Sequence, residues 1–248
     1  MQISTDVLQA LSGCIMNGNA LQIPAQLERK LYEQTNKVLV AAGGKWNRKA
    51  KAHLFDGEAE AAIDPILLTG EITLPSNFGY FPTPPAIAAK VIEAAEIKNT
   101  HWVLEPSAGT GALASLAAPL CRKIVCYELQ AKNVAVLRTI PHVGVVHEMD
   151  FLEAEKEKPP PIYDRIVMNP PFARGDDMKH VLHALRFLAK GGRLVSITSP
   201  SWTFRQGKLG DEFRQMIQDR KATAVHLPAG SFKESGTMVN TMMITIDA

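Results

Sequence analysis

The sequence predicts an α/β fold: a doubly wound, mostly parallel sheet of seven strands (residues 76–248) preceded by a small α+β appendage (residues 1–75). Short apolar runs of strand length alternate with segments of helical periodicity between residues 86 and 246, and this alternation is typical of repeated β-α-β units. A glycine turn follows the first apolar run, and acidic residues follow the second and third. Ligands of open α/β sheets bind at the carboxyl ends of strands, so these polar strand ends predict a binding site.

The composition is that of an ordinary globular protein. The 248 residues are 46% hydrophobic and 21% charged, which suits one large domain with an appendage. The formal net charge is only +2, so any basic surface must be local. The three cysteines, Cys14, Cys121 and Cys126, form no pattern typical of metal ligands, and no metal is predicted. Because the chain shows no secretory signal and no apolar run of about 18 residues, a cytoplasmic protein without membrane contact is predicted.

The appendage, residues 1–75, is predicted to contain three helices. A short helix is expected first. A second helix begins near Pro24, which is a favourable residue for a first helical turn. The third spans residues 56–69, and Gly70 ends it.

A basic stretch, residues 45–55, lies between the second and third of these helices. It carries Trp46 and four cations within seven residues: Lys45, Arg48, Lys49 and Lys51. Cations can contact nucleic-acid phosphates, and a ring can stack on a base, so these residues are candidates for substrate binding. A solvated hairpin with Trp46 packed into a small core would show the same pattern, and both interpretations remain open.

An extended, aromatic-rich segment, residues 78–85, leads into the large domain. A helix over residues 86–96 and the first strand, residues 102–104, follow it. The segment either links the two domains or lies over a ligand.

The turn after the first strand contains Gly109 and Gly111. Glycines let the backbone approach a ligand closely and leave amides available at a helix start. Residue 114 is alanine and no Gly-Lys-Ser/Thr follows, so the turn is neither a dinucleotide loop nor a triphosphate loop. Glu105, beside the glycines, would repel a pyrophosphate but suits a ligand that carries an ammonium group.

The second and third strands both end near carboxylates. The second, residues 123–128, ends in Glu128, at the spacing where α/β folds place an acid on ribose hydroxyls. The third, residues 143–147, is followed by Asp150 and Phe151, which offer an acceptor and an apolar ring.

The central strand, residues 164–168, stops at Asn169-Pro170-Pro171-Phe172. Prolines cannot continue a sheet ladder, and they hold the preceding residues extended. The Asn169 amide oxygen and the Pro170 carbonyl can then accept both hydrogens of one planar amino group, while Phe172 adds a ring for stacking. Taken alone, the motif could be a turn that merely ends a strand.

The rest of the chain completes the sheet. A helix is expected over residues 178–190, ended by Gly191 and Gly192, and another over residues 211–220. The last three strands are expected at residues 193–198, 222–227 and 242–246.

Together these motifs resemble those of the S-adenosylmethionine-dependent methyltransferases, most closely the DNA methyltransferases that modify adenine at N6. The segment Phe81-Pro82-Thr83-Pro84 is similar to the cofactor-clamping Thr-Pro motif of that family. Its place before the glycine turn matches the subgroup that includes the modification subunits of type I restriction systems. The resemblance covers about residues 78–248 and implies the Rossmann-like class I methyltransferase fold.

The resemblance also implies a role for each matching residue. The implied cofactor-binding residues, for S-adenosylmethionine, are Phe81, Thr83, Glu105, Pro106, Ala108, Gly109, Gly111, Glu128, Asp150, Phe151 and Asn169. The implied catalytic residues are Asn169, Pro170, Pro171 and Phe172. Asn169 and Pro170 would bind the target amino group, and Phe172 would stack on the flipped base.

The activity implied is methyl transfer to N6 of adenine in DNA, as in restriction-modification. The same motif would fit an RNA base or a glutamine side chain, and a non-catalytic binder could keep the fold. Family members that read a long DNA site usually carry a large recognition domain, for which residues 1–75 and the loops leave little room. Either the sequence specificity is short and loose, or a separate specificity subunit supplies it. The expected partner is DNA, with such a subunit as the second candidate partner.

Overall fold

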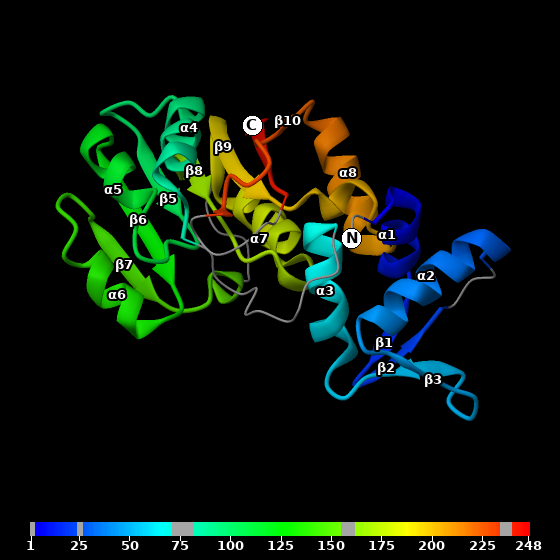
Figure 1. The fold of residues 1–248 in the computed structure, drawn as a ribbon. Coiled ribbons are helices and arrows are strands. Elements are labelled where there is room, and N and C mark those ends of the chain that lie inside the picture. The colour runs from blue at the N-terminus through cyan, green and yellow to red at the C-terminus, as the bar shows by residue number, and fades with distance from the viewer. Residues whose placement is uncertain (1–2, 24–26, 71–81, 155–161, 234–239) are drawn as a thin grey trace.

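The computed structural model describes residues 3–23, 27–70, 82–154, 162–233 and 240–248. Within these residues the chain forms a small four-stranded sheet near the N-terminus and a seven-stranded sheet in the remainder (Figure 1).

The large sheet has the predicted doubly wound arrangement. Its strands are β5 (Trp102–Glu105), β6 (Lys123–Glu128), β7 (Val145–Glu148), β8 (Tyr163–Met168), β9 (Leu188–Thr198), β10 (Thr223–His226) and β11 (Met242–Asp247). They lie in the order β10-β11-β9-β8-β5-β6-β7. Strands β5 to β9 are parallel to one another, and β11 is antiparallel to both of its neighbours. The order reverses at β5 and β8, which is where open α/β sheets hold ligands.

Helices cover both faces of this sheet. They are α4 (Pro85–Ala95), α5 (Ala114–Ala117), α6 (Ala131–Leu137), α7 (Asp176–Ala184) and α8 (Lys208–Asp219). One hydrophobic cluster joins α4 and α5 to one face, and a second joins α7 and α8 to the other. Neighbouring residues of β5, Val103 and Leu104, belong to opposite clusters and are both fully buried, because side chains alternate across a strand. None of the described helices is long and apolar enough to cross a membrane.

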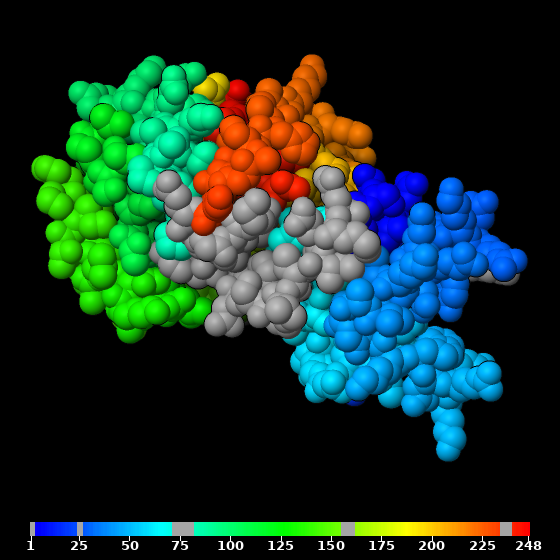
Figure 2. All heavy atoms as spheres, in the orientation of Figure 1, coloured from blue at the N-terminus to red at the C-terminus, as the bar shows by residue number. Residues whose placement is uncertain are grey.

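An N-terminal lobe lies beside the rest of the molecule (Figure 2). It is formed by residues 3–23 and 27–70. Its elements are α1 (Thr5–Ser12), β1 (Ile15–Asn17), β2 (Ala20–Gln22), α2 (Arg29–Ala41), β3 (Lys45–Asn47), β4 (Ala52–Leu54) and α3 (Ala59–Thr69). The four strands are antiparallel in the order β1-β2-β4-β3. As predicted, Gly70 ends α3, in a left-handed conformation (φ +68°). The lobe has a hydrophobic core of its own, with fully buried Leu11, Leu21, Leu39 and Ile63.

The lobe also contacts the part of the chain that carries the large sheet. Phe204 packs against the core of the lobe. The Ser12 hydroxyl donates to the Phe204 carbonyl at 3.3 Å and accepts from the Gln206 amide at 3.3 Å. The predicted boundary between residues 75 and 76 lies outside the described residues, so the division into these two domains stays a prediction.

The predicted helix over residues 178–190 is wrong at its C-terminal end. α7 ends at Ala184, a 3-10 turn η4 (Leu185–Phe187) follows, and β9 begins at Leu188. β9 carries extra residues opposite β8 at this point, and Gly191 has a φ of +75°. Gly191 and Gly192 therefore permit a bulge inside a strand, whereas the sequence alone predicts that they end a helix.

Candidate functional site

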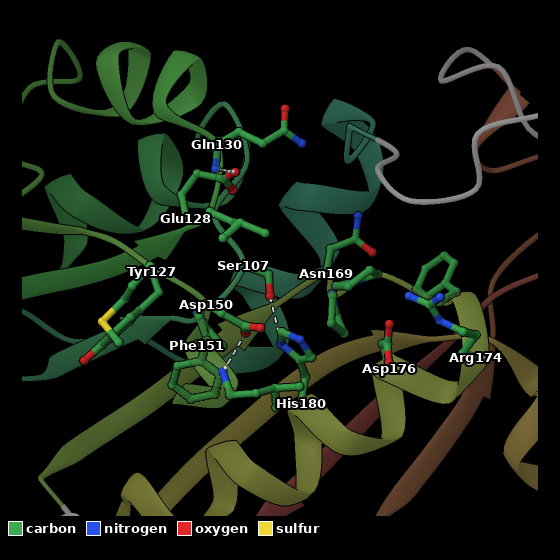
Figure 3. Close-up of a pocket in the computed structure, with 17 residues that line it drawn as sticks. Ser107, Tyr127, Glu128, Gln130, Asp150, Phe151, Asn169, Arg174, Asp176 and His180 are labelled. Atoms are coloured by element: carbon green, nitrogen blue, oxygen red, sulfur yellow. Dashed lines mark hydrogen bonds between the residues drawn. The ribbon is translucent and has the colours of Figure 1, made fainter. Parts of the chain in front are cut away.

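A cavity of about 430 Å³ lies at the carboxyl ends of β5, β6, β7 and β8 (Figure 3). Its volume is typical of small-molecule sites. The residues that line it lie at the ends of these strands, in the segments after them, or in α7. Those predicted from the sequence are Pro106, Glu128, Asp150, Phe151, Asn169, Pro170, Pro171 and Phe172. The structure thus gathers four separately predicted strand ends around one cavity.

Asn169 is held in place from the segment that precedes α4. Its amide Nδ2 donates a hydrogen bond to the Thr83 hydroxyl at 2.9 Å. Thr83 does not itself line the cavity, and Phe81 lies outside the described residues. Thr83 and Asn169, which were each predicted as cofactor-binding residues and lie 86 positions apart in sequence, therefore meet. The bond fixes the plane of the amide beside Pro170.

Phe172 reaches the cavity wall from within the hydrophobic core. Only 2% of its surface is exposed, and Phe232 lies edge-on to its ring, with centroids 6.5 Å apart. Both rings belong to the cluster that includes α4. The ring therefore has little surface to offer a base in this arrangement, and the stacking expected of it stays a prediction that requires the two rings to separate.

Glu128 connects the end of β6 to the glycine turn through hydrogen bonds. Its Oε2 accepts from the Gly109 amide at 2.8 Å. Its Oε1 accepts from the Gln130 amide at 2.8 Å and from Asn133 Nδ2 at 3.2 Å. The carboxylate is buried but lines the cavity, and Oε2, which accepts one hydrogen bond, has capacity for a further one.

Asp150 and Phe151, which follow β7, form another part of the cavity wall. Asp150 Oδ1 accepts from the Leu152 amide at 2.9 Å, which starts the 3-10 turn η2 (Phe151–Glu153). The Phe151 ring packs edge-on against Tyr127, with centroids 5.2 Å apart, and is 2% exposed. The third strand thus supplies the carboxylate and the apolar ring that were predicted there.

The remaining predicted residues of the glycine turn, Glu105, Ala108, Gly109 and Gly111, are buried and do not line the cavity. Gly111 has a φ of +89°, and a Cβ there would meet the end of the Ile140 side chain, so the backbone conformation and the close packing both favour glycine. Glu105 is 2% exposed, and no described residue hydrogen-bonds to its Oε2. Burial raises the pKa of Glu105 well above its usual range, and the nearby Glu128 raises it further.

The cavity residues that were not predicted from the sequence include Ser107, Arg174 and His180. The Ser107 hydroxyl and His180 Nδ1 are 3.1 Å apart and link the glycine turn to α7 (Figure 3). Burial lowers the pKa of His180 to about 4, so its ring is neutral at neutral pH. A histidine in a helix carries no local signal for such a contact, because its partner lies 73 positions earlier.

The basic residues Lys45, Arg48, Lys49 and Lys51 are exposed on the β3–β4 hairpin and do not line the cavity. The tip of this hairpin points away from the large sheet (Figure 1). Trp46 is 53% exposed and tilts against His53, with ring centroids 5.2 Å apart. The structure therefore separates the predicted basic cluster from the cavity.

The family described as Methyltransferase small domain matches residues 88–224, which is more than half of the chain. The chain belongs to this family. The match runs from α4 to β10 and includes every strand end that lines the cavity. The fold is accordingly the Rossmann-like class I methyltransferase fold, as predicted. No curated protein matches the sequence of this methyltransferase significantly.

Solved structures of type I restriction-modification proteins share this methyltransferase fold. The methyltransferase subunit from Streptococcus thermophilus aligns with a TM-score of 0.60 at 21% identity, over 77% of this chain and 50% of that chain. The M protein of the restriction enzyme EcoKI aligns with a TM-score of 0.58 at 16% identity, over 97% of this chain and 56% of that chain. This chain thus spans about half the length of each. The predicted resemblance to type I modification subunits is confirmed at the level of the fold.

Proposed function

We propose that this protein transfers a methyl group from S-adenosylmethionine to the N6 amino group of adenine in DNA. The observation that carries the proposal is the placement of Asn169 beside Pro170 at the cavity, with the Asn169 amide fixed by Thr83. An amide oxygen and a backbone carbonyl held side by side can accept both hydrogens of a planar amino group. The fold similarity to type I modification subunits favours adenine in DNA as the substrate that carries this group.

The residues around the cavity fit S-adenosylmethionine. Glu105 does not line the cavity, but one oxygen of its buried carboxyl has no hydrogen-bond partner among the described residues. We assign this oxygen to the ammonium group of the methionine part, which the glycine turn must admit to reach it. Glu128 would accept from the ribose hydroxyls, and Asp150 from the adenine amino group beside the Phe151 ring. When bound, S-adenosylmethionine supplies a methyl group made electrophilic by its positively charged sulfur.

The protein's own contribution is to position the target amino group. Hydrogen bonds to Asn169 and Pro170 would localise the electron pair on the amino nitrogen and orient it. Positioning and fixed dipoles of this kind supply most of the rate in such a site. The base must leave the duplex stack to reach the cavity, which costs a few kcal/mol. Phe172 would receive the flipped base once Phe232 moves from its ring.

We further propose that the basic hairpin holds nucleic-acid backbone and that a separate specificity subunit reads the DNA sequence. Lys49 and Lys51 are exposed, and Lys45 is paired with Asp56 only through a contact of 3.5 Å between exposed side chains. Such pairs contribute little, so these cations can exchange their present contacts for phosphates. Because these cations lie away from the cavity, we expect them to raise the affinity for nucleic acid and to take no part in the methyl transfer itself.

The test is to incubate the purified protein with methyl-labelled S-adenosylmethionine and, separately, with DNA, RNA and total protein. We expect label in DNA, recovered as N6-methyladenine after digestion to nucleosides. Label recovered in an RNA base or in a glutamine side chain would replace DNA as the substrate. Absence of label in all three mixtures would overturn the proposed activity.

Binding of S-adenosylmethionine is expected to release a proton from Glu105. Burial raises the pKa of Glu105 in the free protein, and an ammonium ligand favours the carboxylate form, so binding should release a proton wherever the pH lies below that raised pKa. Affinity should therefore rise with pH until the pH exceeds the pKa of Glu105 in the free protein. Calorimetry in two buffers of different ionisation enthalpy measures the proton released.

The matched control is Glu105→Gln, which keeps the shape of the side chain but cannot ionise. It should abolish the proton release and weaken binding about ten-fold. Its free energy of unfolding at neutral pH should equal or exceed that of the wild type, because no charge is buried. Proton release that persists in Glu105→Gln would assign the ionisation to another group.

A further inference from the structure

A buried carboxylate of the N-terminal lobe reaches the loop that follows the Asn-Pro-Pro-Phe motif. Asp64 lies in α3 and is 8% exposed. Its Oδ2 accepts a hydrogen bond from the backbone amide of Arg174 at 2.8 Å. Arg174 belongs to the 3-10 turn η3 (Ala173–Gly175), which begins directly after Phe172. The lobe and the candidate active site are therefore joined by a specific polar contact.

The backbone of Arg174 is in a conformation that few side chains tolerate. Its φ is +54°, in the left-handed region, where Cβ approaches the following carbonyl. Such a conformation persists where its surroundings hold it, and Asp64 supplies a partner for the Arg174 amide. The next residue, Gly175, has a φ of +74°, and a Cβ there would lie 2.9 Å from Met178 Cε. The turn thus contains two successive residues in the left-handed region.

This turn places an arginine side chain at the cavity. Arg174 is exposed and lines the cavity near Asp176 and His180 (Figure 3). Asp176 is paired with Lys179 at 2.8 Å. Within the described part of the chain, Arg174 makes no ion pair. Its guanidinium is therefore available for an anion from outside the protein.

We propose that Asp64 is a positioning residue that holds Arg174 in this left-handed conformation, so that the Arg174 guanidinium binds a backbone phosphate next to the target nucleotide. The inference rests on the proposed function, since it takes a nucleic acid as substrate. A nucleotide turned out of its stack leaves its own phosphates at the mouth of the pocket. A guanidinium matches the geometry of a phosphate through two parallel hydrogen bonds. The lobe then contributes to substrate binding through α3 as well as through its hairpin.

The experiment compares Asp64→Ala, Asp64→Asn, Arg174→Ala and the double alanine variant in steady-state methylation of an oligonucleotide. Asp64→Ala and Arg174→Ala should each raise KM for the oligonucleotide about ten-fold, with kcat and cofactor affinity nearly unchanged. Each should also flatten the dependence of log affinity on log salt by about 0.7 to 0.9. The double variant should be no worse than Arg174→Ala, because Asp64 acts through Arg174. Asp64→Asn keeps an oxygen for the Arg174 amide and should stay close to the wild type.

Glu58→Ala is the matched control, because Glu58 is an exposed acid directly before the same helix and makes no side-chain hydrogen bond to the helix start; it should change none of these values. Hydrogen exchange at the Arg174 amide gives a second readout that needs no substrate: exchange should be faster in Asp64→Ala and unchanged in Asp64→Asn. Additive effects in the double variant, or equal damage from Asp64→Asn and Asp64→Ala, would overturn the inference. If the wild-type protein methylates no nucleic acid, the proposed function is overturned, and the phosphate contact is overturned with it. Hydrogen exchange at the Arg174 amide still tests the link between Asp64 and Arg174 in that case.

Discussion

Replacing Asn169 with alanine is expected to lower kcat for methyl transfer by about 10²–10³-fold or more, which is the usual cost of removing a preorganised polar group that acts in the transition state. The Asn169 side chain lines the cavity and is oriented by the Thr83 hydroxyl, so its loss removes a fixed acceptor for the target amino group. The affinity for S-adenosylmethionine should stay nearly unchanged. Single-turnover rates at saturating substrate, with calorimetry of the cofactor, measure the two effects separately.

Thr83→Val is the companion variant to Asn169→Ala. It removes the hydroxyl that orients the amide and keeps the size of the side chain, so kcat should fall by less than in Asn169→Ala. An equal loss in both variants would mean that the segment before α4, and not the amide, limits the reaction. Substantial turnover by Asn169→Ala at saturating substrate would place the acceptor pocket elsewhere in the protein.

The strand ends could be predicted because their signals are local. Glu128 and Asn169 follow an apolar run directly, and Asp150 follows one within a few residues. Parallel strands bring their carboxyl ends to one edge of the sheet. Three residues from three strands therefore reach one cavity without knowledge of any contact between them. The chain order of strands and helices sufficed to place them.

Other features depend on contacts between residues that are distant in sequence. The burial of Phe172 depends on Phe232, and Arg174 takes its conformation beside Asp64, 110 positions earlier. No local pattern in the sequence indicates either pair. The end of α7 was mispredicted for a related reason: Gly191 fits a helix end and a strand bulge equally well, and pairing with β8 decides between them.

Replacing Glu128 with alanine is expected to weaken binding of S-adenosylmethionine by about 10- to 100-fold, or roughly 1–3 kcal/mol. In our proposal the variant loses the acceptor for the ribose hydroxyls. It also leaves three donors without their acceptor: the Gly109 amide, the Gln130 amide and Asn133 Nδ2. Because Gly109 lies in the glycine turn, the turn itself should become less ordered, and the melting temperature should fall as well.

Asn133→Ala separates these two causes. It removes one of the three hydrogen bonds to Glu128 but keeps the carboxylate at the cavity, so it should lower the melting temperature with little effect on cofactor affinity. Calorimetry well below the melting temperature of each variant then measures binding by folded protein alone. An equal loss of affinity in both variants would mean that Glu128 acts only by supporting the turn. Tighter binding of a nicotinamide dinucleotide than of S-adenosylmethionine by the wild type would contradict the cofactor assignment itself, since the turn would then accept a pyrophosphate beside Glu105.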